Sequence, residues 1–213
     1  MEIFELEDVE GQARSGIIRT NHGAIETPVF MPVATQGSVK ALDSADLIGL
    51  DASILLGNTY HLYLRPGVKT ITNLGGLHRM MNWDKPILTD SGGFQGFSLK
   101  HLRKIEEDGI RFKSHIDGSQ HVLTPESVMN IQGSLGSDIV MPLDVCSPAD
   151  SDFATVRAGL ELTNRWMDRT LGSLNENQRL FGIVQGGLFT ELRERSAEYL
   201  VGLDLSGYSI GGL

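Results

Sequence analysis

Short apolar runs recur along the chain, and four of them stop on a small acid, an amide or a glycine. Six runs of this kind cover residues 27–33, 53–58, 86–90, 139–146, 181–187 and 208–213. Stretches with helical spacing separate them, and a short apolar run between such stretches is typical of a buried parallel strand. The pattern therefore predicts an α/β fold in which strands and helices alternate.

Capping signals and apolar periodicity predict five helices between these runs. Asp43 or Ser44 can begin the first, Thr124-Pro125-Glu126 supplies an N-cap and a first-turn proline, and Thr190 is expected to cap the last. The expected ranges are 43–50, 66–76, 124–136, 153–171 and 190–202. One insertion interrupts the alternation: residues 110–116 and 120–123, joined by Asp117-Gly118, predict a β-hairpin.

The end of the sequence bears on the architecture. Six β/α units are about three quarters of the eight that a (β/α)8 barrel of the TIM-barrel type contains. The last residues, 210–213, form a strand end, and six strands cannot close such a barrel. We expect residues 1–213 to form a single, incomplete barrel domain with the hairpin insertion near 110–123, because no Pro/Gly/Ser-rich linker divides them.

The candidate functional residues lie at the ends of the predicted strands. Parallel strands of such folds place their carboxyl ends on one rim, so Asp90, Asp144, Gln185 and Gly212 are expected to converge. Two carboxylates and an amide suit a flat polar ligand such as a purine. One carboxylate can accept both the N1–H and the exocyclic amine of a guanine-like base, and an amide can donate to its O6. The alternative is that each is a buried polar residue satisfied by neighbouring backbone.

The segment 89–95, TDSGGFQ, contains the densest signal. Gly92 and Gly93 allow backbone amides to approach a ligand, and Phe94 offers a flat face for stacking. Asp90 is placed to accept or donate a proton, with Ser91 beside it. The alternative is a tight turn after a strand, in which Asp90 only caps backbone amides.

Charge and composition narrow the class of protein. Eighteen basic and twenty-seven acidic residues give a net charge of −9, which is the wrong sign for a broad phosphate-binding face. Basic residues cluster locally at 100–104 and 111–113, where solvated charge is the simpler interpretation. The single cysteine, Cys146, excludes an internal disulfide. With an acidic start and no long apolar stretch, this predicts a cytoplasmic protein without a membrane span.

Several motifs together resemble the tRNA-guanine transglycosylases, also called queuine tRNA-ribosyltransferases. They are TDSGGFQ at 89–95, LGNTYHL at 56–62, GSDIVM at 136–141, FGIVQGG at 181–187 and IGGL at 210–213. The resemblance covers nearly the whole chain and the first part of the family's sequence. It implies a (β/α)8 barrel with a zinc-binding insertion. It also implies exchange of guanine at the tRNA wobble position for a 7-deazaguanine, in queuosine biosynthesis, through a covalent ribosyl–enzyme intermediate.

The resemblance assigns roles to individual residues. Asp90 matches the acid/base carboxylate, and residues 91–94 match the base-binding turn with its stacking aromatic, Phe94. Asp144 and Gln185 match the residues that contact the base edge. Gly212 matches a backbone donor to the base, and Leu213 would place a carbonyl near the base substituent.

Two further residues, Cys146 and His61, have two interpretations each. A cysteine at position 146 resembles the bacterial branch of the family, which takes pre-queuosine bases with an aminomethyl arm. Bacterial members commonly have an acidic residue just before this cysteine, where this chain has Val145. A wall residue of the pocket is a simpler role for Cys146 than a nucleophile, because no histidine lies at a recognisable spacing. His61 belongs either behind the base or to the packed core.

The family's nucleophilic carboxylate, its zinc-binding cysteines and its basic tRNA-binding surface lie beyond the part matched here. With one cysteine this chain cannot form that zinc site, so we expect no metal and no cofactor in it. We also expect the chain by itself not to catalyse exchange. The intact enzyme would act on tRNA and could pair as a homodimer. The alternatives are a non-catalytic deazaguanine-binding partner subunit, and a different (β/α) enzyme whose Gly-Gly turns bind phosphate.

Overall fold

A six-stranded parallel sheet forms the centre of the computed structural model, which describes residues 3–93, 103–175 and 178–212. The strands occur in the sheet in their sequence order, and each hydrogen-bonded pair is parallel. They are β4 (Val33–Ala34), β5 (Leu55–Gly57), β6 (Ile87–Thr89), β10 (Ile139–Val140), β11 (Arg179–Val184) and β12 (Gly207–Ile210). Sequential order is what successive β/α units wound in one direction produce. The predicted α/β fold is confirmed.

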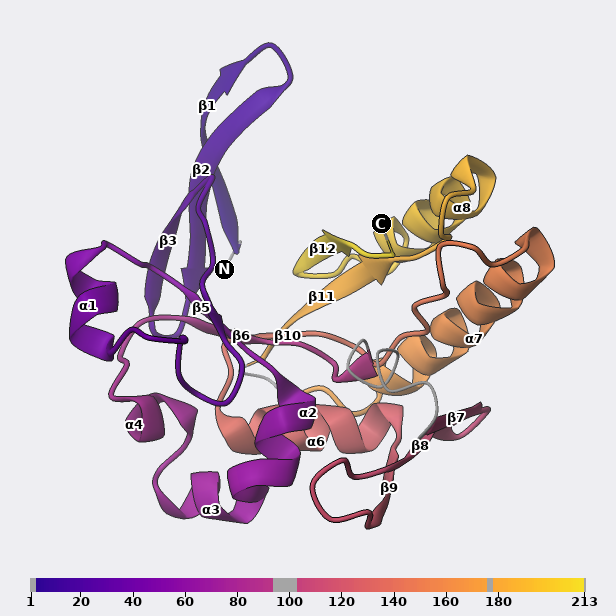
Figure 1. Cartoon of the computed structure of the whole chain (residues 1–213). Helices are drawn as coiled ribbons and strands as arrows, with labels where there is room; N and C mark the ends of the chain where they lie inside the picture. The colour runs from indigo at the N-terminus through magenta and orange to yellow at the C-terminus, as the bar shows by residue number, and fades with distance from the viewer. Residues whose placement is uncertain (1–2, 94–102, 176–177, 213) are drawn as a thin grey trace.

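The helices connect these strands. They are α1 (Ser44–Gly49), α2 (Thr59–Leu62), α3 (Val68–Asn73), α4 (Leu77–Met81), α6 (Pro125–Leu135), α7 (Phe153–Leu171) and α8 (Thr190–Val201), with a π-helical turn, η1 (Tyr63–Gly67), after α2. Helices α6, α7 and α8 follow one another along the sheet beside β6, β10 and β11 (Figure 1). No helix in the described residues is long and apolar enough to cross a membrane.

Local capping signals determine several helix ends. Asp43 and Thr124 each accept a hydrogen bond from the third backbone amide of their helix, and Gly136 ends α6 in the left-handed conformation. The prediction for Thr190 is wrong, because Phe189 occupies the N-cap and Thr190 is the first helical residue. No side-chain hydrogen bond caps that end of α8.

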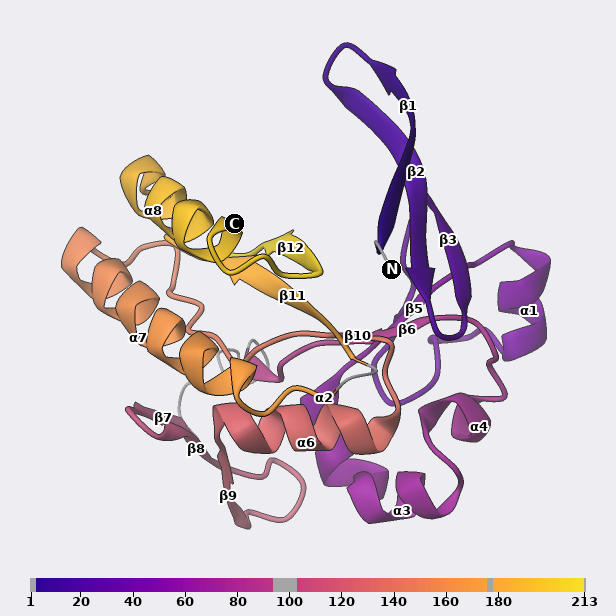
Figure 2. The same cartoon turned by 180° about the vertical axis from the view of Figure 1, so that it is seen from behind.

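Two antiparallel sheets flank the parallel one. The first contains β1 (Phe4–Glu10), β2 (Ala13–Thr20) and β3 (Gly23–Thr27), and its β1–β2 hairpin projects away from the rest of the chain (Figure 2). The second contains β7 (Arg103–Glu106), β8 (Gly109–Lys113) and β9 (Gln120–Leu123). The predicted hairpin is therefore present. Its strands are joined by residues 114–119, a longer connection than the expected two-residue turn.

Two predicted strands are much shorter than expected. Residues 27–33 do not form one strand: Thr27 ends β3 and Val33 begins β4, with Pro28 and Pro32 between them. Proline has no amide hydrogen to donate to a ladder. The run 139–146 forms a strand only at Ile139–Val140. Beyond this strand, the Gln132 side chain hydrogen-bonds both the backbone amide and the backbone carbonyl of Met141. Met141 therefore does not continue the hydrogen-bonding pattern of the sheet.

The main hydrophobic core lies between the parallel sheet and the helices. Trp166 of α7 and Met129 and Leu135 of α6 are fully buried there against Val140 and Leu143. Burying one such side chain contributes roughly 1.5–3 kcal/mol. The packing of α6 and α7 fixes the segment after β10, which carries one of the candidate site residues.

Candidate functional site

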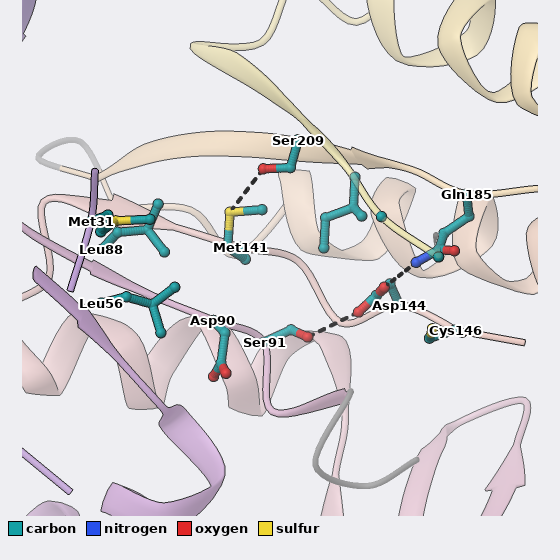
Figure 3. A pocket seen from close by; sticks show the side chains of 13 residues that line it. Met31, Leu56, Leu88, Asp90, Ser91, Met141, Asp144, Cys146, Gln185 and Ser209 are labelled. Atoms are coloured by element: carbon teal, nitrogen blue, oxygen red, sulfur yellow. Dashed lines mark hydrogen bonds between the residues drawn. The ribbon is translucent and has the colours of Figure 1, made fainter. Parts of the chain in front are cut away.

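Residues that follow four different strands line one cavity. Asp90 comes directly after β6, Gln185 directly after β11, Gly212 two residues after β12 and Asp144 four residues after β10. All four border the same cavity of about 240 Å³. Its remaining wall is mainly apolar, formed by Met31, Leu56, Leu88, Met141 and Ile183 (Figure 3). Polar groups therefore meet apolar walls in a space suited to one small planar molecule.

A hydrogen-bonded chain of three side chains forms one end of the cavity. The Ser91 hydroxyl donates to Oδ1 of Asp144 at 2.9 Å, and Nε2 of Gln185 donates to Oδ2 at 2.6 Å (Figure 3). Asp144 is 6% exposed. Burial raises the pKa of its carboxyl, and the nearby Asp90 charge adds to this, while hydrogen bonds from Ser91, Gln185 and its own backbone amide oppose it. A carboxylate can accept about four hydrogen bonds, so Asp144 keeps capacity for a ligand donor.

The Asp90 side chain points away from Asp144 (Figure 3). Its Oδ2 accepts a hydrogen bond from Nδ2 of Asn58 at 2.5 Å, and its Oδ1 accepts one from the Thr59 amide at 2.8 Å. The Thr59 hydroxyl also donates to the Asp90 backbone carbonyl, at 2.6 Å. The start of α2 thus holds Asp90 at the cavity wall. This fits the capping alternative and leaves the carboxylate at the site.

Two glycines are required by the close approach of backbone and side chains. A Cβ on Gly93 would lie 2.9 Å from Oδ1 of Asp144, and one on Gly212 would lie 2.5 Å from Oε1 of Gln185. Gly212 also has a φ of +68°, which favours glycine. Gly92 has a φ of +79° and packs on Tyr60. Phe94 and Leu213, which were also predicted at the site, lie outside the described residues.

Cys146 lines the cavity and is half-buried, whereas Val145 points the other way. The Val145 side chain is 9% exposed and belongs to the main core. Its amide donates to the Thr163 hydroxyl of α7 at 2.9 Å. Because successive residues of an extended segment alternate in direction, this bond keeps Asp144 and Cys146 on the cavity side.

His61 lies in a group of aromatic side chains behind the wall that carries Asp90. Its ring contacts Tyr60 and His115 edge-on, and the Tyr60 hydroxyl is 2.9 Å from Nδ1 of His115. Burial and the neighbouring His115 lower the pKa of His61, while the Asp90 charge opposes them. His61 does not border the cavity itself.

The sequence analysis missed Gln132, which ties two strand ends together. This fully buried residue of α6 accepts hydrogen bonds from the Thr89 hydroxyl at 2.9 Å and the Met141 amide at 3.0 Å, and it donates to the Met141 carbonyl at 2.8 Å. Thr89 precedes Asp90, and Met141 borders the cavity. A signal existed: Gln132 lies on the apolar face of its helix, between Val128 and Leu135.

In the described residues, one group has the composition of a metal site: His22, His78 and Asp138. Asp138 Oδ1 accepts from Nδ1 of His22 at 2.8 Å and from its amide, Oδ2 accepts from the Ile87 amide, and Nε2 of His78 lies 3.3 Å from Oδ2. The imidazole rings are stacked 3.6 Å apart with planes 19° from parallel. The three candidate ligand atoms lie within 4.8 Å of one another, but both oxygens of Asp138 already accept hydrogen bonds from His22 and from backbone amides.

The histidine–aspartate group is better interpreted as an anchor. His22 lies in the turn between β2 and β3, and Asp138 directly precedes β10. Burial opposes ionisation of Asp138, but the donors around it outweigh burial and lower its pKa. The group holds the N-terminal sheet to the end of β10 opposite the cavity.

The sequence was compared with known protein families and curated proteins. The family model described as queuine tRNA-ribosyltransferase matches residues 8–213. Proteins named queuine tRNA-ribosyltransferase from Caldanaerobacter subterraneus subsp. tengcongensis and Solidesulfovibrio magneticus are 57% and 54% identical over 208 and 213 residues. These alignments cover 97% and 99% of this chain and 56% and 57% of the relatives.

A protein of the same name from Fusobacterium nucleatum is 53% identical over 214 residues, which cover 99% of this chain and 57% of that relative. The chain thus spans a little over half the length of the curated relatives it matches. The family model and the curated relatives match the same, nearly complete, part of this chain. The chain belongs to the queuine tRNA-ribosyltransferase family.

Proposed function

We propose that the protein carrying this chain is a tRNA-guanine transglycosylase. It exchanges guanine at the tRNA wobble position for a 7-deazaguanine in queuosine biosynthesis, and this chain supplies the part that binds the base. The observation that carries the proposal is the chain Ser91–Asp144–Gln185 at the end of an otherwise apolar cavity. Family membership supports the same conclusion.

Recognition of the base follows from the free hydrogen-bonding capacity of these groups. Ser91 and Gln185 donate to different oxygens of the Asp144 carboxylate, which can accept further hydrogen bonds from the N1–H and the exocyclic amine of guanine. The Gln185 amide donates one of its two hydrogens to Asp144 and can donate the other to O6. Adenine has neither an N1–H nor an amine at C2, so in the same orientation it would offer Asp144 no donor from the base.

Asp90 is the acid/base group of the proposed reaction. It would protonate guanine as the base leaves and accept the proton of the incoming deazaguanine. For this the side chain must leave Asn58 and Thr59, which now hold it, and turn towards the base. The exchange also needs a nucleophile for the ribose. Among the described cavity residues the only carboxylates are Asp90 and Asp144, so we propose that this chain alone binds the base without exchanging it.

The incoming base is proposed to be the pre-queuosine base of the bacterial branch. Cys146 supports this assignment, because its small side chain borders the cavity and leaves room for an aminomethyl arm. Val145 is turned into the core, where it packs against α7, and does not compete for that space. In this proposal tRNA is the second substrate.

A second function uses the same cavity without catalysis. The chain could be a deazaguanine-binding partner of a catalytic subunit, which the engaged state of both cavity carboxylates favours. Titration calorimetry of the chain with guanine and adenine tests base recognition, and selective binding of guanine is expected. Incorporation of labelled guanine into tRNA by the whole natural protein then separates the two functions. Binding of phosphate with indifference to guanine would refute both.

A further inference from the structure

Arg193 of α8 links the two glycine turns beside the cavity. Its Nη1 donates to the carbonyl of Gly211 at 2.9 Å and to that of Gly187 at 3.3 Å. Gly187 belongs to the turn after β11 and Gly211 to the turn after β12. Arg193 is half-buried and does not border the cavity. A single terminal nitrogen of arginine carries two hydrogens, so it can serve both carbonyls at once.

The bond from Arg193 fixes the direction of the next peptide group. The Gly211 amide donates to the Val184 carbonyl at 3.0 Å, and the Gly211 carbonyl accepts from Arg193. The peptide between Gly211 and Gly212 is planar and trans, so its carbonyl and its amide hydrogen point in opposite directions. With the carbonyl held towards α8, the Gly212 amide hydrogen is directed away from α8. Gly211 and Gly212 both border the cavity.

We infer that Arg193 is a positioning residue for base binding, which aims the Gly212 amide at O6 of the bound guanine. The inference rests on the proposed function, because it assigns a further part of the same site. Close packing keeps the arrangement rigid. A Cβ on Gly186 would lie 2.6 Å from the Arg193 amide nitrogen, and one on Gly211 would lie 2.9 Å from Nε2 of Gln185.

The test compares guanine with 6-thioguanine, whose sulfur is a much weaker acceptor at the same position. Binding of both bases is measured by calorimetry on the whole natural protein and on its Arg193→Ala variant. We expect Arg193→Ala to weaken guanine binding about tenfold, the effect of losing one directed hydrogen bond, and to change 6-thioguanine binding little. Arg195→Ala is the matched control, because Arg195 lies on the same helix with an exposed side chain.

The possible results distinguish a failure of the Arg193 assignment from a failure of the proposed function. If the wild-type protein does not bind guanine, both are refuted. If the wild-type protein binds guanine and Arg193→Ala binds it with the same affinity, only the Arg193 assignment is refuted. An equal loss for both bases also overturns it, because that indicates a general structural role. If Arg193→Ala does not fold, Arg193→Lys decides: lysine keeps the charge but lacks the planar fork, so a smaller, guanine-selective loss is expected. If Arg193→Lys has the same ratio of guanine affinity to 6-thioguanine affinity as the wild-type protein, the inference is overturned.

Discussion

Changing Asp144 to asparagine tests base recognition at its centre. The Asp144 side chain is 6% exposed. Asparagine has nearly the same volume as aspartate, so the substitution leaves the shape of the cavity unchanged. It converts one of the two acceptor ends into a donor. Guanine presents two donors side by side, and in the proposed function the aspartate accepts both. In the variant, one base donor faces an amide hydrogen, and the other faces an uncharged oxygen.

The size of the effect follows from the number of bonds involved. A hydrogen bond to a charged acceptor contributes roughly 1.5–3 kcal/mol, and a neutral one about 1 kcal/mol. Losing one charged bond and weakening the second therefore costs about 3 kcal/mol, or roughly a hundredfold in dissociation constant. Reorganisation of Gln185, which donates to the same carboxylate, adds to this loss.

Calorimetry at neutral pH measures guanine and hypoxanthine, which lacks the exocyclic amine. Wild-type protein should prefer guanine, and Asp144→Asn should lose most of that preference. The control is Asp204→Asn, the same change at an exposed residue whose φ of 50° asparagine adopts readily. If Asp144→Asn kept guanine affinity within about threefold of wild type, the assignment of Asp144 to the base edge would be wrong.

The pH dependence gives an independent check on Asp144. Burial raises the pKa of its carboxyl, so wild-type guanine affinity should fall on acidification at a higher pH than an ordinary aspartate would cause. The free energy of unfolding changes with pH in the opposite direction. Because the pKa of Asp144 is raised in the folded state, its contribution to the free energy of unfolding is fully present below its unfolded pKa and is lost as pH rises through its folded pKa. Asp144→Asn should lack both effects.

Three further predictions address other parts of the structure. Gly212→Ala places a Cβ 2.5 Å from Gln185 at a φ of +68°, so guanine affinity should fall at least about tenfold by calorimetry; unchanged affinity contradicts the close approach. Asn58→Ala removes a 2.5 Å bond that Asp90 must break before it turns to the base, so in exchange assays of the whole protein kcat should rise by up to about tenfold with little change in KM; a lowered kcat would contradict a resting position of Asp90 on Asn58. Asp138→Ala should lower the free energy of unfolding in urea by about 3 kcal/mol, and a loss below about 1 kcal/mol would contradict the anchor. Because the pKa of Asp138 is lowered, its contribution is present above the unfolded pKa and lost as pH falls through the folded value.

The parallel strands were predictable because their signals are local. Each run is apolar, short and bounded by glycine or polar residues, and the caps at Asp43 and Thr124 need only a few neighbouring residues. The N-terminal sheet was not predicted. Its first strand alternates apolar and acidic residues over Phe4–Glu7, which is typical of a strand, but the segment is short, acidic and exposed throughout Phe4–Glu10.

The site was predictable in its rim residues but not in the groups that hold them. Asp90, Asp144 and Gln185 follow apolar runs, and the geometry of parallel strands brings such positions together. Asn58 and Gln132 act through tertiary contacts over 32 and 9 residues. No local pattern specifies which strand end a helix side chain will reach. Asp144 shows the limit of such a prediction: β10 ends at Val140, six residues before the end of the predicted run 139–146, yet Asp144 still borders the cavity.

The two aspartates on either side of β10 show how environment separates anchoring from recognition. Asp138 precedes the strand and is surrounded by donors from the protein, which lower its pKa although it is buried. Asp144 follows the strand with two donors, and burial prevails and raises its pKa. A buried carboxylate with unused lone pairs is costly unless a ligand supplies the missing donors. Its position beside a cavity is consistent with the proposal of a ligand that presents paired N–H groups.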